Sequence, residues 1–200
     1  MFRQVWSTPN LLTLLRLIII PFIVIFVVER HYGWALGLFI AAGISDGLDG
    51  LLARALHQRT LLGQYLDPIA DKLLLSTMFL VLAATHRTPA LVFATVLVFA
   101  RDILILIVCT LLYITGAMKL FRPSVFGKAN TLAQIVTVPM VLLHEVSDAN
   151  WIAVGRKAGI YATIALTVIS GVHYVVRLAF AQRSSDKHSA TSDQHSAPDQ

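Results

Sequence analysis

The sequence predicts an all-α polytopic membrane protein with six transmembrane helices. Hydrophobic residues make up 56% of the 200 residues and charged residues only 14%, and the mean hydropathy is +0.73. This is far more apolar surface than one soluble core could bury. The apolar runs can cross about 30 Å of hydrocarbon as helices. They are apolar on every face, whereas the strands of a membrane barrel would alternate apolar and polar residues.

The six spans follow from apolar runs taken in order. The runs lie near Leu11–Val28, Trp34–Leu56, Leu66–Ala84, Leu91–Thr115, Thr131–Leu143 with its flanks, and Ile160–Phe180. Thr8 and Pro9 suit the cap and first turn of the first helix. We expect this first run to be retained rather than cleaved as a signal peptide. It is long, it contains Arg16 and Pro21, and the following VVERHYG lacks a small-residue cleavage site.

The composition changes abruptly after residue 182. Residues 1–182 hold all six predicted spans, and residues 183–200, RSSDKHSATSDQHSAPDQ, contain no apolar run to bury. The sequence therefore predicts one six-helix transmembrane domain followed by a disordered polar tail. Cys109 is the only cysteine, so an internal disulfide is excluded.

Lysine and arginine are distributed unevenly between the predicted spans. Seven of them fall on the side of the N-terminus and four on the other: Arg3, Arg59, Lys119, Arg122, Lys128, Arg183 and Lys187 against Arg30, Arg87, Arg156 and Lys157. The positive-inside rule then places both termini in the cytosol. A net charge of +5 suits anionic lipid head groups. Nucleic-acid binding is not expected, because no soluble basic module remains outside the spans.

Four aspartates, Asp46, Asp49, Asp67 and Asp71, lie inside or at the edge of strongly apolar segments. An aspartate at the centre of a membrane helix costs about 2.5 to 3.5 kcal/mol on insertion scales. Four such residues therefore indicate cation binding or proton transfer, as in a membrane enzyme or a transporter.

Helical spacing gathers these side chains on two faces. Asp46, Asp49, Gly50, Ala53 and Arg54 follow at i, i+3, i+4, i+7 and i+8, and Asp67 and Asp71 form an i, i+4 pair on the next helix. The short connection around Gly63 returns the chain antiparallel, so both pairs can converge in one cleft. Four carboxylates so close would raise one another's pKa values unless one or two hard divalent cations neutralised them. Two ions about 3.5 to 4 Å apart would suit displacement at phosphorus.

Small residues on the first of these faces leave room for a ligand. Gly50 and Ala53 allow close approach to the backbone, and Arg54 can offer a planar fork to phosphate oxygens. The alternative is a small-residue packing face between helices. The combination with Arg54 and the aspartates favours the ligand interpretation.

The residues Asp46, Asp49, Gly50, Ala53, Arg54, Gly63, Asp67 and Asp71 match every fixed position of the signature D-x2-D-G-x2-A-R-x8-G-x3-D-x3-D. The chain thereby resembles the CDP-alcohol phosphotransferases from Thr8 to Ala181. The resemblance implies a six-helix, homodimeric membrane enzyme whose four aspartates bind two Mg2+ or Mn2+ ions. It also implies that Asp71 is the general base, and that the CDP group lies against Gly50, Ala53, Arg54 and Gly63.

Within that family, TPNLLTLLRLIIIPF and RTLLGQYLDPIADKLLL are similar to the branch of phosphatidylglycerophosphate synthases and CMP-forming cardiolipin synthases. This implies an inner-membrane enzyme of phospholipid biosynthesis with a cytoplasmic active site. It would transfer a phosphatidyl group from CDP-diacylglycerol to glycerol 3-phosphate, or to phosphatidylglycerol as the alternative acceptor. In the first group the arginine at position 101 is usually followed by Glu, whereas here Asp102 follows.

Three basic residues are candidates for binding the acceptor phosphate: Arg101, Lys128 and Arg122. Arg101 lies mid-span, where a charge facing lipid is costly. The alternative for Arg101 is an ion pair with Asp102 or with the aspartate motif that only ties helices together. For Lys128 and Arg122 the alternative is the positive-inside rule.

Two other classes of protein remain open. An intramembrane prenyltransferase also holds magnesium diphosphate with aspartates, but it lacks the D-G-x2-A-R element. A cation or proton transporter could use the aspartates as a relay. We find no second copy of the Ser45 to Leu75 pattern, which disfavours an inverted-repeat transporter.

Overall fold

The structure is a computed structural model, and it describes residues 8–55, 61–114 and 125–195. Side chains are described for residues 14–45, 69–108, 110, 114 and 125–173. All regular structure in this part of the chain is helical, which confirms the all-α fold class. The helices are α2 (Thr8–Val28), α3 (Tyr32–Ala55), α4 (Leu61–His86), α5 (Pro89–Ile114), α6 (Val125–Val146) and α7 (Asn150–His195).

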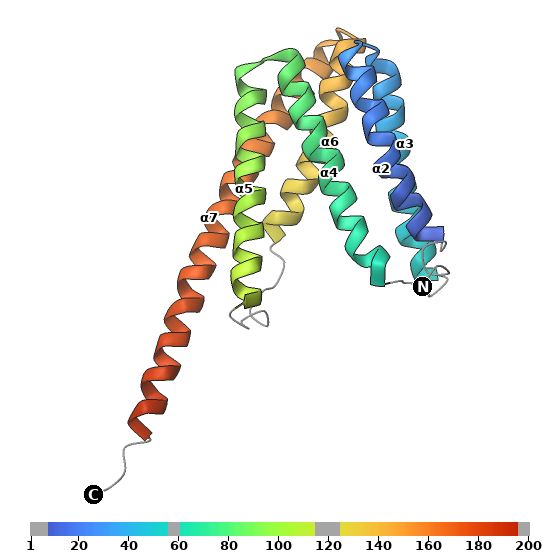
Figure 1. Ribbon diagram of the computed structural model, residues 1–200. Coiled ribbons are helices and arrows are strands. Elements are labelled where there is room, and N and C mark those ends of the chain that lie inside the picture. The colour runs from blue at the N-terminus through green and yellow to red at the C-terminus, as the bar shows by residue number, and fades with distance from the viewer. Residues whose placement is uncertain (1–7, 56–60, 115–124, 196–200) are drawn as a thin grey trace, which may run out of the picture.

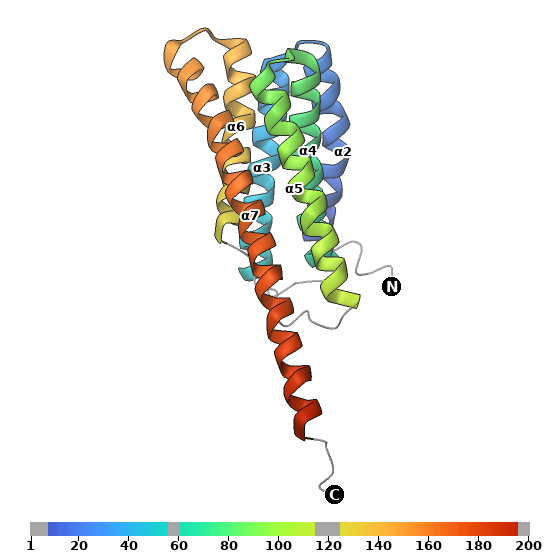
Figure 2. The same ribbon diagram turned by 90° about the vertical axis from the view of Figure 1, so that its left-hand side faces the viewer.

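The helices stand side by side in an elongated bundle (Figures 1 and 2). Helix α3 ends at Ala55 and helix α4 begins at Leu61, and we call this end of the bundle the motif end. Helix α2 begins there, and α7 runs past the other helices in the same direction (Figures 1 and 2). The start of α2 and the end of α7 therefore lie toward the same end of the molecule.

The opposite end of the bundle, the far end, is closed by tight turns. Arg30 and Arg87 adopt positive φ angles of 62° and 45°. After α2, the His31 N–H donates to the Phe26 carbonyl at 2.8 Å and the Arg30 N–H to the Val27 carbonyl at 3.1 Å. This pair of bonds is a Schellman cap with Arg30 at its left-handed position. Such caps reverse the chain within a few residues, so α2 and α3 pack as antiparallel neighbours.

Helix α4 supplies much of the buried core. Its Phe79, Met78 and Leu82 are at most 1% exposed and pack in one cluster with Ile23 of α2 and Leu142 of α6. Helices α2, α5 and α6 all contact α4, and α7 packs along α5 and α6. Helix α4 is therefore the element around which α2, α5 and α6 pack.

The outer surface of the bundle is apolar, as lipid contact requires. Ile18, Phe22, Val96 and Leu106 are between 53% and 68% exposed. A contiguous surface of this kind would be a liability in water, but hydrocarbon solvates it. Among the described residues, four helices are long and apolar enough to span a membrane: Ile69–His86, Pro89–Val108, Val125–Val146 and Asn150–His173.

The remaining two helices show shorter apolar stretches, Leu14–Val28 and Tyr32–Ser45, within the residues whose side chains are described. The six helices and the membrane-embedded fold class are confirmed, and the number of complete spans is approximate. Trp34 and Trp151 are 71% and 64% exposed near the far end. Tryptophans in such positions mark a membrane–water interface.

Helix α7 differs most from the sequence-based prediction. It begins at Asn150 rather than near Ile160, because Arg156 and Lys157 interrupt the apolar run without interrupting the helix. It also continues as helical backbone to His195, past the predicted domain boundary at residue 182. Extending an existing helix needs no new nucleus, so a polar segment can follow it. The division into a domain and a tail stays a prediction.

Helices α6 and α7 approach closely at Gly159. A Cβ atom there would lie 2.8 Å from Thr137 Oγ1 and 3.4 Å from Thr137 Cα. Thr137 is fully buried, and its hydroxyl is bound to the Ala133 carbonyl at 2.7 Å and to Thr163 at 3.1 Å. The threonine therefore cannot turn away without losing these bonds.

We expect Gly159→Ala to destabilise the protein by about 1 to 3 kcal/mol through overpacking, measured as a lower thermal unfolding midpoint in detergent. Gly171→Ala on the same helix is the matched control. A Cβ there meets nothing within 4 Å, and alanine favours the helix by about 0.8 to 1 kcal/mol. Equal rises in the midpoint for both variants would show that Gly159 is not a packing contact.

Candidate active site

The aspartate motif occupies the two helices that meet at the motif end (Figure 1). Asp46 and Asp49 lie in the last turns of α3, and Asp67 and Asp71 in the first turns of α4. Gly50, Ala53 and Arg54 are also in α3. Gly63 was predicted to lie in the connection, but it lies in the first turn of α4, because this helix already begins at Leu61. The predicted helical backbone of both segments is present. The side chains of residues 46–68 lie outside the described part, so their convergence stays a prediction.

Asp71 is the motif residue whose surroundings are described. Its side chain is 42% exposed and accepts a hydrogen bond from Arg16 Nη1 of α2, an ion pair between groups 55 residues apart in sequence. The Arg16 side chain is only 3% exposed. A buried guanidinium is costly without a partner, so Asp71 explains why Arg16 can lie inside the bundle. Arg16 faces the site rather than the lipid head groups.

A cavity of about 330 Å³ lies beside Asp71 and Arg16. Helices α3, α4 and α6 supply most of its walls: Phe39, Ile40, Gly43, Ile44, Leu74, Leu75, Thr131, Ile135 and Pro139. The volume falls at the lower end of the range of small-molecule pockets, about 300 to 1,000 Å³. A half-exposed carboxylate on the wall of such a cavity is accessible to a ligand.

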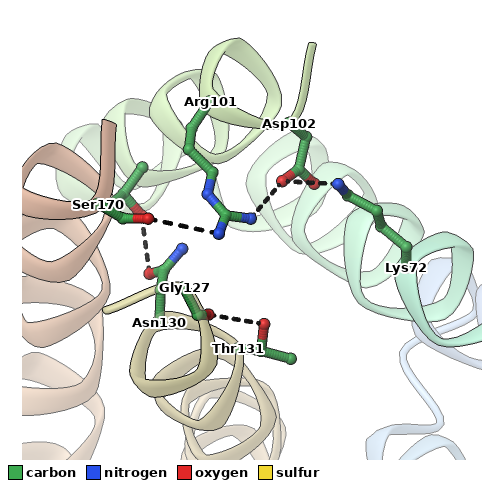
Figure 3. Close-up of polar contacts among 8 residues, drawn as sticks. Lys72, Arg101, Asp102, Gly127, Asn130, Thr131 and Ser170 are labelled. Carbon is green, nitrogen blue, oxygen red and sulfur yellow. Dashed lines mark hydrogen bonds and ion pairs between the residues drawn. The ribbon is translucent and has the colours of Figure 1, made fainter. Parts of the chain in front are cut away.

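A second polar cluster links α4, α5 and α7 (Figure 3). Asp102 Oδ1 accepts a hydrogen bond from Arg101 Nη1 at 2.9 Å and forms an ion pair with Lys72 Nζ at 3.1 Å. Arg101 Nη2 also donates to Ser170 Oγ at 3.4 Å. Arg101 and Asp102 are only 11% and 14% exposed. The predicted Arg101 to Asp102 ion pair is therefore present, and these three charged groups carry one positive charge in excess.

Asn130 of α6 faces this cluster. Its Oδ1 accepts a hydrogen bond from Thr167 Oγ1 at 2.9 Å, which fixes the orientation of the amide, and Figure 3 shows the amide nitrogen pointing toward the Arg101 guanidinium. Within the described residues, the buried atoms Asn130 Nδ2 and Arg101 Nε have no acceptor. Buried donors normally have partners, so these two atoms are exceptions among the described residues.

The other acceptor candidates are placed less specifically. Lys128 lies exposed in the first turn of α6, and the described contacts do not join it to Arg101. Arg122 lies outside the described residues. Sequence reasoning missed Lys72 and Ser170. Lys72 directly follows Asp71 in the sequence. Each residue of a helix is rotated by about 100° from the one before, so this position could have predicted that Lys72 points away from the Asp71 face and toward α5.

The surroundings of Asp71 are compatible with the binding of a divalent cation. In the part of the chain with described side chains, no three His, Cys, Asp or Glu residues come together, but Asp46, Asp49 and Asp67 fall outside that part. Of the four motif aspartates, Asp71 is the one whose side chain is described. It offers half-exposed carboxylate oxygens on a cavity wall, and Mg2+ prefers such ligands.

Taken together, apolar helices around a cavity with one carboxylate on its wall define an integral membrane protein with a polar site inside the bundle. Residues 6–176 match the family model described as CDP-alcohol phosphatidyltransferase, and the chain belongs to this family. It is accordingly a membrane-embedded transferase of phospholipid biosynthesis, in a family that is generally dependent on divalent metal.

Curated relatives carry two kinds of name. A CDP-diacylglycerol–glycerol-3-phosphate 3-phosphatidyltransferase of Aquifex aeolicus is 33% identical over 181 residues, covering 86% of this chain and 95% of the relative. A putative cardiolipin synthase of Mycobacterium tuberculosis is 35% identical over 150 residues, covering 74% and 70%. The human CMP-forming cardiolipin synthase is 29% identical over 164 residues, covering 73% and 53%. The first name includes CDP-diacylglycerol and glycerol 3-phosphate, and the human name describes a CMP-forming reaction.

Proposed function

We propose that the protein transfers the phosphatidyl group of CDP-diacylglycerol to glycerol 3-phosphate, giving phosphatidylglycerophosphate and CMP. The observation that carries the proposal is Asp71. This last aspartate of the motif lies half-exposed on the wall of an intramembrane cavity in a chain of the CDP-alcohol phosphatidyltransferase family. Nearly full-length similarity to a relative with this activity in its name supports glycerol 3-phosphate as the acceptor.

The chemistry assigned to Asp71 is general-base catalysis. The acceptor hydroxyl oxygen attacks the phosphorus that carries the diacylglycerol group, and the bond from this phosphorus to the CMP oxygen breaks. The hydroxyl proton passes to Asp71, and CMP leaves with the bonding electron pair. The Arg16 guanidinium donates to one Asp71 oxygen, so it orients the carboxylate.

The remaining motif residues have the roles that the family resemblance implies. Asp46, Asp49 and Asp67 join Asp71 as ligands of two Mg2+ or Mn2+ ions. When bound, such ions neutralise negative charge on the phosphates. Gly50, Ala53, Arg54 and Gly63 shape the CDP site, with Arg54 as a fork for phosphate oxygens.

For the acceptor phosphate we propose Arg101, together with Lys128 and Arg122. The excess positive charge at Arg101, Asp102 and Lys72 and the buried donor atoms of Arg101 and Asn130 support an anion there. A dianionic monoester phosphate suits this set of donors better than the monoanionic phosphodiester of phosphatidylglycerol.

We expect Arg101→Ala to raise the KM for glycerol 3-phosphate about tenfold to hundredfold, the range for a lost hydrogen bond to a charged group. Lys128→Ala should act in the same direction. The KM for CDP-diacylglycerol should stay nearly unchanged in both variants. Initial rates of CMP release, with each substrate varied in turn, measure these values.

Lys157→Ala is the matched control for loss of a cation, because Lys157 is exposed near the far end. This variant should keep both KM values. Equal rises of both KM values in Arg101→Ala would remove Arg101 from the acceptor site and leave it a role in packing α5 against α7.

A CMP-forming cardiolipin synthase is the second candidate function. The specific observation in its favour is the 35% identity to the putative cardiolipin synthase of Mycobacterium tuberculosis. Wild-type protein that ignores glycerol 3-phosphate and condenses CDP-diacylglycerol with phosphatidylglycerol would establish this function instead.

We also propose a homodimer in a cell inner membrane, with the motif end and both termini in the cytoplasm. The excess of Lys and Arg on that side supports this orientation. A cysteine introduced into the 183–200 segment of a Cys109→Ser background should resist membrane-impermeant maleimide in intact cells and react after lysis. Reaction of this cysteine in intact cells would show that the C-terminal segment lies on the outer side of the membrane, opposite to the proposed orientation.

A further inference from the structure

The second polar cluster lies beside the cavity on whose wall Asp71 lies. We call it the arginine cluster, and it consists of Lys72, Arg101, Asp102, Asn130 and Ser170. Asp71 and Thr131 line the cavity. Lys72 directly follows the first of them on α4, and Asn130 directly precedes the second on α6. Neighbouring residues of a helix differ by only about 1.5 Å along its axis, so the cluster and the cavity lie at the same depth in the bundle.

The Arg101 guanidinium is held from two sides (Figure 3). Nη1 donates to Asp102 Oδ1 at 2.9 Å, and Nη2 donates to the fully buried Ser170 Oγ at 3.4 Å. Residues i and i+1 of a helix do not face each other, so Arg101 and Asp102 meet only because both side chains bend together over the surface of α5. The bond therefore selects one orientation among the many that the long arginine side chain allows.

Asp102 matters more to Arg101 than to its other partner, Lys72. The Lys72 ammonium lies 3.1 Å from the same carboxylate oxygen, but the lysine side chain is half-exposed. Solvent can therefore stabilise the lysine charge without the carboxylate. The Arg101 side chain is largely buried, and a buried cation depends on its counter-charge. The main effect of Asp102 is consequently on the guanidinium.

We propose that Asp102 is a positioning residue of the acceptor site, which holds the Arg101 guanidinium in the orientation that binds the acceptor phosphate. This inference rests on the proposed transfer to glycerol 3-phosphate. Asp102 and Ser170 each occupy one N–H group of Arg101. Among the described residues, Arg101 Nε has no acceptor, so N–H groups of the guanidinium are left for oxygens of the ligand.

The negative charge of Asp102 makes the positioning role testable by the sign of the effect. A carboxylate near a bound anion repels it. If Asp102 contributed only its charge, replacing it with a neutral residue would therefore lower the KM for glycerol 3-phosphate. A positioning residue gives the opposite result, because Arg101 leaves its binding orientation when the bond is lost.

The test compares Asp102→Asn and Asp102→Glu with wild-type protein by CMP release, with each substrate varied in turn. In Asp102→Asn the KM for glycerol 3-phosphate should rise about tenfold, equal to about 1.4 kcal/mol. The KM for CDP-diacylglycerol and the kcat should change less than about threefold. Asp102→Glu keeps a charged acceptor for Arg101, so its KM for glycerol 3-phosphate should stay within about threefold of wild type.

Two further variants separate position from charge and from folding. The double variant Lys72→Met, Asp102→Asn keeps one positive charge in excess, as in wild-type protein, and should still show the raised KM for glycerol 3-phosphate. It decides the question where Asp102→Asn does not fold, as judged by the thermal unfolding midpoint in detergent. Asp148→Asn is the matched control, because Asp148 is exposed between α6 and α7, and it should keep both KM values.

A double-mutant cycle shows whether Asp102 acts through Arg101. Added to Arg101→Ala, the Asp102→Asn change should raise the KM for glycerol 3-phosphate by less than about threefold more, because no guanidinium remains to be positioned. Full multiplication of the two effects, a fall of this KM in Asp102→Asn, or equal rises of both KM values would overturn the positioning role. Wild-type protein that releases no CMP with glycerol 3-phosphate would instead overturn the proposed function.

Discussion

Replacing Asp71 with Asn lowers kcat by about 10² to 10⁴-fold, the typical contribution of a general base, while binding of CDP-diacylglycerol survives. The amide keeps the size of the carboxylate but cannot accept the proton of the attacking hydroxyl. It also leaves the buried Arg16 without its charged partner in this pair. Single-turnover release of CMP and equilibrium binding of the donor are the two measurements.

Asp148→Asn serves as the control for Asp71→Asn, since Asp148 is exposed between α6 and α7 at the far end. It should retain wild-type kcat. The thermal unfolding midpoint of Asp71→Asn in detergent separates a loss of chemistry from a loss of fold. Parallel loss of donor binding and turnover would make Asp71 a plain metal ligand rather than the base.

Asp46→Asn, Asp49→Asn and Asp67→Asn should each abolish CMP release. Each change removes a charged oxygen from the proposed metal site, and a hard divalent cation binds neutral amides less strongly than carboxylates. The helices themselves should persist, because the motif residues lie in the end turns of α3 and α4, away from the core around Phe79 and Met78.

Direct metal binding supports the interpretation of these variants. Titration with Mn2+ followed by electron paramagnetic resonance should show fewer bound ions or weaker binding in each variant than in wild-type protein. Near-normal turnover in magnesium for any one of the three would remove that aspartate from the ligand set.

Hydropathy was sufficient to predict the six helices and the fold class. Spans as apolar as Leu91–Thr115 have no alternative to the membrane, and the helix α5 agrees with the prediction within two residues at either end. The start of α7 was misjudged because Arg156 and Lys157 interrupt the apolar run while their backbone stays helical. Average polarity does not distinguish an interfacial helix from a loop.

The partners of buried charges could not be predicted from sequence alone. Arg16 had two possible environments, and only the packing of α2 on α4 places it against Asp71. The pairing of Lys72 with Asp102 similarly depends on the rotation of α4 relative to α5. Motif spacing determines which residues share a helix face, whereas the contacts between helices are set by the packing of many apolar side chains.

The most direct test of the central claim is CMP release by the purified protein from CDP-diacylglycerol in magnesium, with glycerol 3-phosphate, phosphatidylglycerol, serine and inositol phosphate as separate acceptors. We predict magnesium-dependent release with glycerol 3-phosphate and formation of phosphatidylglycerophosphate. Absence of CMP release with every acceptor, or release that persists unchanged in EDTA, would contradict the assignment as a metal-dependent phosphatidyltransferase.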